Sequence, residues 1–245
     1  AQQGDGDGKG LPVILIHGFG SNRESWVLNV PALGARRRVF AIDLPGHGET
    51  PGPVSEEAAA AIHEAVVDWA VSMRLERFHL VGLSMGAAIA QAAALAAPER
   101  VASLALLSSV VLGKLDQPFV EGFLAAHDPQ AMRPWIEMLF AAPALVTPEL
   151  IDDLVRYKNM PGTDADLWAY ARTVLGGASL SDLARHFEEL AMPTLVVFGD
   201  QDRVTPPPSA MPPGSILVTG AGHMPHIEAA SRVNALLSEF MARND

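Results

Sequence analysis

The sequence has no cysteine, few aromatic residues and no long hydrophobic run. Without cysteine, this 245-residue chain can form neither a disulfide, nor a catalytic thiolate, nor a zinc–thiolate site. No apolar stretch approaches the roughly 20 residues that span a bilayer. Residues 1–8 also lack the pattern of a signal peptide. We therefore expect a cytoplasmic protein. Neither a metal nor a cofactor is expected, because the histidines lack the spacing of metal ligands.

Positive charge is also scarce, with 17 Lys and Arg against 28 Asp and Glu and a formal net charge of −11. This acidic balance argues against nucleic acid or an anionic membrane as a partner. Hydrophobic residues make up 49% of the chain, which is enough for one well-buried core. No linker rich in Ser, Gly or Pro divides the chain, so one domain with an insertion is expected.

Short apolar runs alternate with helical patterns along most of the sequence, which is typical of a parallel α/β sheet. The predicted strands cover residues 13–16, 38–43, 78–83, 101–107, 194–199 and 215–218. The clearest helical patterns cover residues 55–73, 85–96 and 227–241. The fold class predicted from this alternation is α/β, with a mostly parallel sheet flanked by helices.

The alternation stops between residues 113 and 185, where only helical patterns occur, at 117–127, 131–140, 148–159 and 164–175. Ligands of open α/β sheets bind at the carboxyl ends of the strands, so a helical insertion would cover that edge as a cap. We therefore expect a core of residues 11–112 and 186–245, a helical cap of residues 113–185, and a flexible N-terminal segment of residues 1–10.

The segment Gly82-Leu83-Ser84-Met85-Gly86 joins a predicted strand to a predicted helix. A G-x-S-x-G at such a junction is the nucleophile elbow, which holds a serine in a strained turn at the positive end of a helix. The flanking glycines allow the strand and the helix to pack closely. The alternative is a glycine-rich loop that merely contains a serine. The downstream residues favour the elbow.

Attack on an acyl carbon needs a hydroxyl, a base that takes its proton, and a carboxylate that orients the base. Ser84 is the candidate nucleophile. His223 lies in a tight loop between the last strand and the closing helix, and is the candidate base. The carboxylate should lie between them in the sequence, where Asp200 and Asp202 follow a strand. Asp202 is favoured because the loop needs a residue or two to turn inward, and Asp200 is interpreted as a loop cap.

An oxyanion hole needs two backbone N–H groups, which we assign to Met85, after the nucleophile, and to Phe19, in the loop after the first strand. His17 is interpreted as a structural residue that holds this loop. The remaining histidines are assigned to packing, to the surface or to the lining of the site: His47, His63, His79, His127, His186 and His226.

Several segments resemble motifs of the α/β-hydrolase superfamily: His17-Gly18-Phe19-Gly20, residues 43–48, residues 82–86, Gly199 to Pro206, and Gly222-His223. The resemblance implies the α/β-hydrolase fold with an inserted helical cap, and a catalytic triad of Ser84, Asp202 and His223. Within the superfamily, residues 119–123, 138–147 and 156–158 are similar to the α/β-hydrolase domain of acyltransferase (dihydrolipoyllysine acetyltransferase) components of acetoin dehydrogenase complexes.

Two departures from the resemblance are expected. Such hydrolases begin with an antiparallel hairpin, which residues 1–10 are too short to form. The acetoin-complex acyltransferases also carry a lipoyl-bearing segment ahead of this domain, and this sequence has none. The resemblance therefore does not carry swinging-arm acyl transfer over to this chain alone.

These residues predict a serine hydrolase that cleaves a small-molecule acyl substrate, a carboxylic ester or thioester, through an acyl-serine intermediate. Two alternatives remain, an acyltransferase and a non-catalytic ligand receptor on a hydrolase scaffold. Carbon–carbon bond hydrolysis and perhydrolysis use the same triad. Six residues of the insertion could form an apolar acyl pocket or simply pack the cap: Phe119, Phe123, Trp135, Met138, Phe140 and Trp168.

Overall fold

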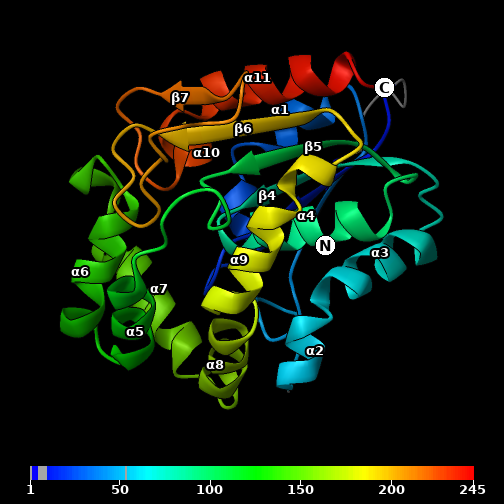
Figure 1. The fold of residues 1–245 in the computed structure, drawn as a ribbon. Helices are drawn as coiled ribbons and strands as arrows, with labels where there is room; N and C mark the ends of the chain where they lie inside the picture. Colours follow the sequence, from blue (N-terminus) through cyan, green and yellow to red (C-terminus); the bar gives the residue numbers. More distant parts are fainter. Residues whose placement is uncertain (1, 5–9, 53) are drawn as a thin grey trace.

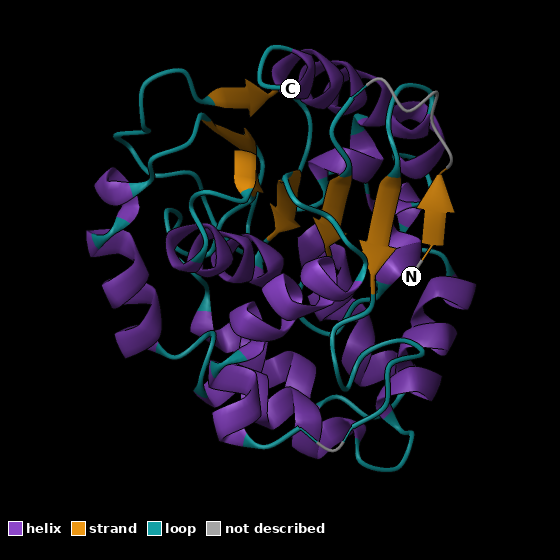
Figure 2. Ribbon diagram, turned by 90° about the vertical axis from the view of Figure 1, so that its right-hand side faces the viewer, coloured by secondary structure: helices purple, strands orange, loops and turns teal. Residues whose placement is uncertain are grey.

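A seven-stranded sheet forms the centre of the protein in a computed structural model that describes residues 2–4, 10–52 and 54–245. Its strands are β1 (Gln2–Gly4), β2 (Val13–Ile16), β3 (Val39–Ile42), β4 (Phe78–Leu83), β5 (Val101–Leu107), β6 (Thr194–Gly199) and β7 (Ile216–Val218). They lie in the order β1-β3-β2-β4-β5-β6-β7. Every neighbouring pair is parallel except β1 and β3, whose arrows point in opposite directions in Figure 2.

The central strands are near-continuous apolar runs because both faces of the sheet are covered. Every residue of β2, β3, β4 and β5 is buried. Ile16 of β2 pairs with Ile42 of β3 and with Gly82 of β4, and Leu83 pairs with Leu107 of β5. The parallel strands therefore end close to one level, and the loops that follow them gather at one edge of the sheet.

Helices cover both faces (Figure 1). One face carries α1 (Val30–Gly34) and α11 (Ala230–Ala242), and the other carries α3 (Ile62–Ser72), α4 (Met85–Ala96) and α9 (Gly177–Arg185). The short elements are η1 (Arg23–Trp26), α2 (Glu56–Ala60), η3 (Phe187–Glu189) and α10 (Pro225–Glu228). Among the described residues, no helix is both long enough and apolar enough to cross a membrane.

A separate group of helices forms the cap, at the lower left of Figure 1. It contains α5 (Gln117–Ala125), α6 (Pro129–Leu139), η2 (Pro143–Leu145), α7 (Pro148–Lys158) and α8 (Thr163–Arg172). Asp128 and Thr147 cap two of these helices, because their side chains accept hydrogen bonds from Ala131 N at 2.9 Å and Leu150 N at 3.3 Å. The buried Lys158 joins three helices, with Nζ 2.5 Å from Leu124 O and 3.1 Å from Asp164 Oδ1.

The predicted α/β fold class is confirmed, and three local expectations differ from the structure. Residues 2–4 form a strand that pairs with β3 and so covers backbone groups that β3 would otherwise expose at the sheet edge; residues 1 and 5–9 lie outside the described residues. The predicted helix 55–73 is divided at Ala61 into α2 and α3. Finally, α9 lies against α4, where Gln91 Nε2 donates to Leu183 O at 2.7 Å, so residues 177–185 pack with the core helices.

Four histidines of the described chain are fully buried, His17, His47, His79 and His226. Burial disfavours the charged imidazolium, and lowers the pKa values of His17 and His79 to about 4 and those of His47 and His226 to about 3. The ordinary pKa of histidine is about 6.5. All four rings are therefore neutral in the folded protein at pH 7.

These buried rings predict that the protein loses stability as the pH falls from 7 to 5. Their folded-state pKa values lie below the unfolded value of about 6.5, so protons bind preferentially to the unfolded chain. The stabilisation is complete above pH 6.5 and decreases below it, by up to about 1.4 kcal/mol per pH unit for each ring. Denaturant unfolding at pH 7, 6 and 5 measures this slope. An unfolding free energy that stays constant over this range would contradict it.

Candidate active site

Ser84 lies between β4 and α4, with φ 56° and ψ −115°. Residues other than glycine rarely adopt this backbone conformation. A Cβ atom at Gly86 would overlap the carbonyl oxygens of Ile16 and His17, and one at Gly82 would overlap the backbone of Gly86. The start of α4 therefore packs directly on the end of β2. Since Ser84 N donates to Leu107 O at 2.9 Å, the turn is also attached to β5.

His223 and Asp202 form a buried pair on the neighbouring loops. His223 Nδ1 lies 2.9 Å from Asp202 Oδ2, and the two residues are 3% and 5% exposed. An ionised carboxylate only accepts hydrogen bonds, so the Nδ1 atom of His223 carries a proton and donates to Asp202. Asp200, by contrast, is exposed and accepts a hydrogen bond at 2.8 Å from Gly220 N, in the exposed loop after β7.

Thr205 connects this pair to the strand end beside Ser84. Asp202 Oδ1 accepts hydrogen bonds from Val204 N and Thr205 N at 2.9 and 2.8 Å, and Thr205 Oγ1 lies 3.0 Å from Oδ2. The same hydroxyl is 3.1 Å from the carbonyl oxygen of Ser108, the residue after β5. Burial raises the pKa of the Asp202 carboxyl, but the interaction with His223 and the bonds from Thr205 outweigh it, so this pKa lies below its ordinary value.

The loop after β2 lies beside Ser84, because a Cβ atom at Gly18 would be 3.4 Å from Ser84 Cβ. His17 holds this loop: Nδ1 donates to Gly18 O at 2.8 Å, and Nε2 accepts from Leu44 N at 3.1 Å. Both ring nitrogens are thus occupied by backbone partners. Phe19 follows Gly18 directly, and Met85 begins α4.

Both tyrosines of the chain attach the cap to the loop after β3. Tyr157 on α7 donates to Gly46 O, and Tyr170 on α8 donates to Pro45 O, each at 3.0 Å. Burial raises the pKa of both hydroxyls, so they remain protonated donors. This loop carries His47, whose ring centroid is 4.9 Å from that of His17. The sequence pattern did not indicate that either tyrosine contacts this loop.

Aromatic side chains of α5 reach the loop after β2. The ring of Phe123 occupies the space where Gly20 would carry a side chain, at 2.5 Å from that Cβ position. Its centroid is 5.6 Å from that of Phe19 and 6.2 Å from that of Phe119. Phe140 is buried at the end of α6. The structure therefore brings three of the candidate pocket residues, Phe119, Phe123 and Phe140, into the cap interior.

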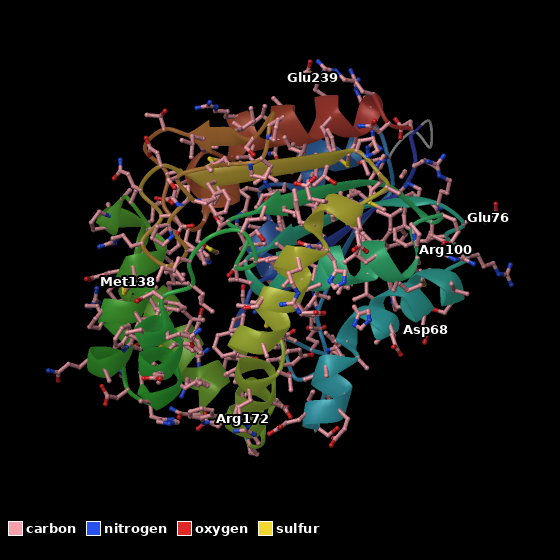
Figure 3. All side chains as sticks on the ribbon, in the orientation of Figure 1. Asp68, Glu76, Arg100, Met138, Arg172 and Glu239 are labelled. Atoms are coloured by element: carbon pink, nitrogen blue, oxygen red, sulfur yellow. The ribbon has the colours of Figure 1, made fainter. Side chains whose placement is uncertain are left out.

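The other candidate pocket residues lie elsewhere. Trp135 packs on Gly122, where a Cβ atom would overlap its ring, and so joins α5 to α6. Met138, labelled on α6 in Figure 3, is partly buried. Trp168 is 42% exposed, and the guanidinium of Arg172 lies over its ring at 5.7 Å, at the lower end of the molecule in Figure 3. The structure therefore does not place Trp168 in a pocket, because its indole faces solvent.

Ser103, His79 and Asp245 form a contact group near the amino ends of β4 and β5. His79 Nδ1 is 2.8 Å from Ser103 Oγ, and His79 Nε2 is 3.1 Å from Asp245 Oδ1. Ser103 is only 1% exposed and His79 is completely buried, so a substrate cannot reach this serine. Within the described part of the chain, no group of three or more potential ligands is placed to hold a metal ion.

Known proteins resemble this chain in sequence and in fold. The chain is 37% identical over 242 residues to the dihydrolipoyllysine-residue acetyltransferase component of an acetoin cleaving system from Pseudomonas putida, covering 96% of this chain and 64% of the relative. It is 30% identical over 252 residues to a pimeloyl-[acyl-carrier protein] methyl ester esterase from Neisseria meningitidis serogroup A, covering 94% of this chain and 76% of that one.

Among solved structures, a meta-cleavage product hydrolase from Pseudomonas fluorescens IP01 matches with a TM-score of 0.83 and 26% identity, over 97% of this chain and 93% of the other. Residues 13–236 match the alpha/beta hydrolase family. Since this match covers strands β2 to β7, the cap and the first half of α11, the chain belongs to the alpha/beta hydrolase family.

Proposed function

We propose that this protein is a serine hydrolase that cleaves small carboxylic esters or thioesters through an acyl-Ser84 intermediate. The proposal rests on one observation: the turn of Ser84 and the Asp202–His223 pair are both attached to the end of β5. Ser84 N donates to Leu107 O, and the Asp202–His223 pair is joined through Thr205 to Ser108 O. A strained serine and an oriented imidazole at one sheet edge are what acyl transfer requires.

In the proposed mechanism, His223 Nε2 accepts the hydroxyl proton of Ser84 as its Oγ attacks the acyl carbon. The carbonyl oxygen becomes an oxyanion, which the N–H groups of Phe19 and Met85 stabilise. The imidazolium, stabilised by Asp202, then returns the proton to the departing oxygen or sulfur as that bond breaks. A water, deprotonated by His223, attacks the acyl-serine in the same way, and the acid and the free serine are released.

The acyl group of the substrate would lie against the aromatic side chains that the cap brings to Gly20. Phe123 and Phe119 form the apolar surface nearest to Phe19. Apolar walls with few polar groups are typical of small-molecule sites. We infer a cytoplasmic location for such an enzyme, supported by the absence of cysteine.

A second candidate function is acyl transfer to a thiol. The relative from Pseudomonas putida that is 37% identical is an acetyltransferase component, which favours this candidate. Both functions share the acyl-serine and differ only in the nucleophile that attacks it. The chain spans 64% of the length of that relative. The activity of the longer protein is therefore only proposed for this chain.

The first prediction is that a fluorophosphonate probe labels the wild-type protein at Ser84 and does not label Ser84→Ala. Removal of the nucleophile should lower kcat for an activated short-chain ester by a factor on the order of 10⁶. The measurements are peptide mass mapping and steady-state kinetics. A protein that binds ligands without catalysis would remain unlabelled in both forms. Labelling at another residue would contradict the assignment of Ser84.

The two neighbouring carboxylates provide a matched pair of variants. Asp202→Asn should lower kcat by about 10⁴, because the amide favours the wrong imidazole tautomer. Asp200→Asn changes a carboxylate that bonds only to an exposed loop, so its activity should stay within a few-fold of wild type. Steady-state rates with one ester decide between them. A greater loss in Asp200→Asn would show that the wrong carboxylate was assigned.

Product partitioning separates hydrolysis from acyl transfer. We expect that an activated acetyl ester gives free acetate as the main product, both alone and with millimolar dihydrolipoamide, because His223 can deprotonate a water at the acyl-serine. The two products are quantified by chromatography at several acceptor concentrations. Acetyl-dihydrolipoamide as the main product at low acceptor concentration would instead favour the acyltransferase.

A further inference from the structure

The carboxylate of Glu228 connects the His223 loop to the cap. Glu228 is the last residue of α10 and is partly buried. Its Oε2 accepts a hydrogen bond from Gly222 N at 2.6 Å, and its Oε1 accepts from Ala141 N at 2.7 Å and from Ala142 N at 3.2 Å. Ala141 and Ala142 follow helix α6, and Gly222 immediately precedes His223. One side chain therefore binds the backbone on both sides of this junction.

The two backbones are also in direct contact. His223 N donates to Leu139 O, the end of α6, at 2.9 Å. A Cβ atom at Gly222 would lie 2.7 Å from Ala141 N and 2.9 Å from Leu139 O, so only a glycine lets the segments approach this closely. No side chain separates them. A displacement of residues 139–142 would therefore move the backbone of His223.

Arg203 attaches the same part of the cap to the Asp202 loop. Its guanidinium donates to Phe140 O at 2.9 Å and also to Glu137 O. These carbonyls lie at the end of α6, where a cation is favourable because the last carbonyls of a helix lack partners. Arg203 directly follows Asp202 in the sequence. The end of α6 thus contacts the loops of both members of the Asp202–His223 pair.

The Glu228 side chain matches the three backbone donors at this junction. Its ionised carboxylate accepts three backbone N–H groups, and hydrogen bonds to an ionised acceptor are about twice as strong as neutral ones. An amide in its place has only one acceptor oxygen, so it cannot serve both sides of the junction, and its NH₂ group would face a backbone donor. The site thus requires both carboxylate oxygens and the full length of glutamate.

We propose that Glu228 is a positioning residue: by binding Gly222 and Ala141 together, it fixes the His223 imidazole relative to Ser84 and makes that geometry depend on the cap. This inference rests on the proposed function, in which His223 is the base. Glu228 acts through the backbone of residues 222–223 and not by contact with the substrate. A misplacement of about 1 Å at a reacting group can lower the rate by about 100-fold.

The test compares Glu228→Gln and Glu228→Asp with the wild-type protein. The glutamine variant loses one acceptor oxygen and the charge, whereas the aspartate variant keeps the charge but loses reach. We expect each variant to lower kcat by about 10- to 100-fold, with KM changed less than threefold. The rate constant for fluorophosphonate labelling of Ser84 should fall by the same factor. Thermal melting shows that each variant is folded under the assay conditions.

The control variant is Glu239→Gln on α11, which removes a carboxylate whose partner is Arg243 one helical turn away. Glu239 lies on the far side of the molecule from the cap in Figure 3, and its variant should match the wild type in every measurement. Wild-type kcat and labelling rate in a folded Glu228 variant would overturn the proposal. A rise in KM alone, or loss of the fold in both Glu228 variants, would also overturn it, because either result indicates a purely structural role. A wild-type protein that the probe does not label would instead contradict the proposed function.

Discussion

The contact between the start of α4 and the end of β2 is the constraint on which the arrangement of this sheet edge depends. It exists because Gly82 and Gly86 have no side chains, and a methyl group at either position would overlap backbone atoms that cannot move aside. The turn that follows holds Ser84 at φ 56°, at a typical cost of about 1–3 kcal/mol. Burial of the surrounding strands and of α4 supplies the stabilisation that offsets this strain.

The cap is attached to the core at the loops that form the site. Two tyrosine hydroxyls bind the loop after β3, and the end of α6 binds the loops of Asp202 and His223. These contacts are directional hydrogen bonds to backbone carbonyls and N–H groups, so they determine where the cap lies as well as holding it. An apolar contact of similar area would allow the cap to slide. The same loops therefore hold both the cap and the candidate catalytic residues.

Two histidines show how local partners give the same side chain different chemistry. In His17 and in His223 the proton lies on Nδ1, directed at Gly18 O in the first and at Asp202 in the second. The Nε2 lone pair of His17 already accepts a hydrogen bond from Leu44 N, and burial lowers the pKa of this ring to about 4. His17 therefore cannot take a proton from a neighbouring hydroxyl. In His223, by contrast, the partner of Nδ1 is the buried carboxylate of Asp202 instead of a backbone carbonyl.

Much of this arrangement could be predicted because its signals are local. The strands are continuous apolar runs, since a parallel sheet is buried on both faces, and a G-x-S-x-G carries its own steric requirement. The preference for Asp202 over Asp200 also followed from loop length. The prediction was incomplete where the local patterns were weak. The sequence did not indicate β1, and it placed α9 with the cap.

The sequence by itself determined the fold class, the position of the elbow and the order of its candidate partners. The tertiary structure alone decided which aromatic side chains approach Gly20, that Trp168 faces solvent, and that Glu228, Tyr157 and Tyr170 bind the loops of the site. The physical reason is the separation of the partners. Glu228 and Ala141 are 87 residues apart, and Tyr170 and Pro45 are 125 apart, so their meeting depends on how whole layers pack.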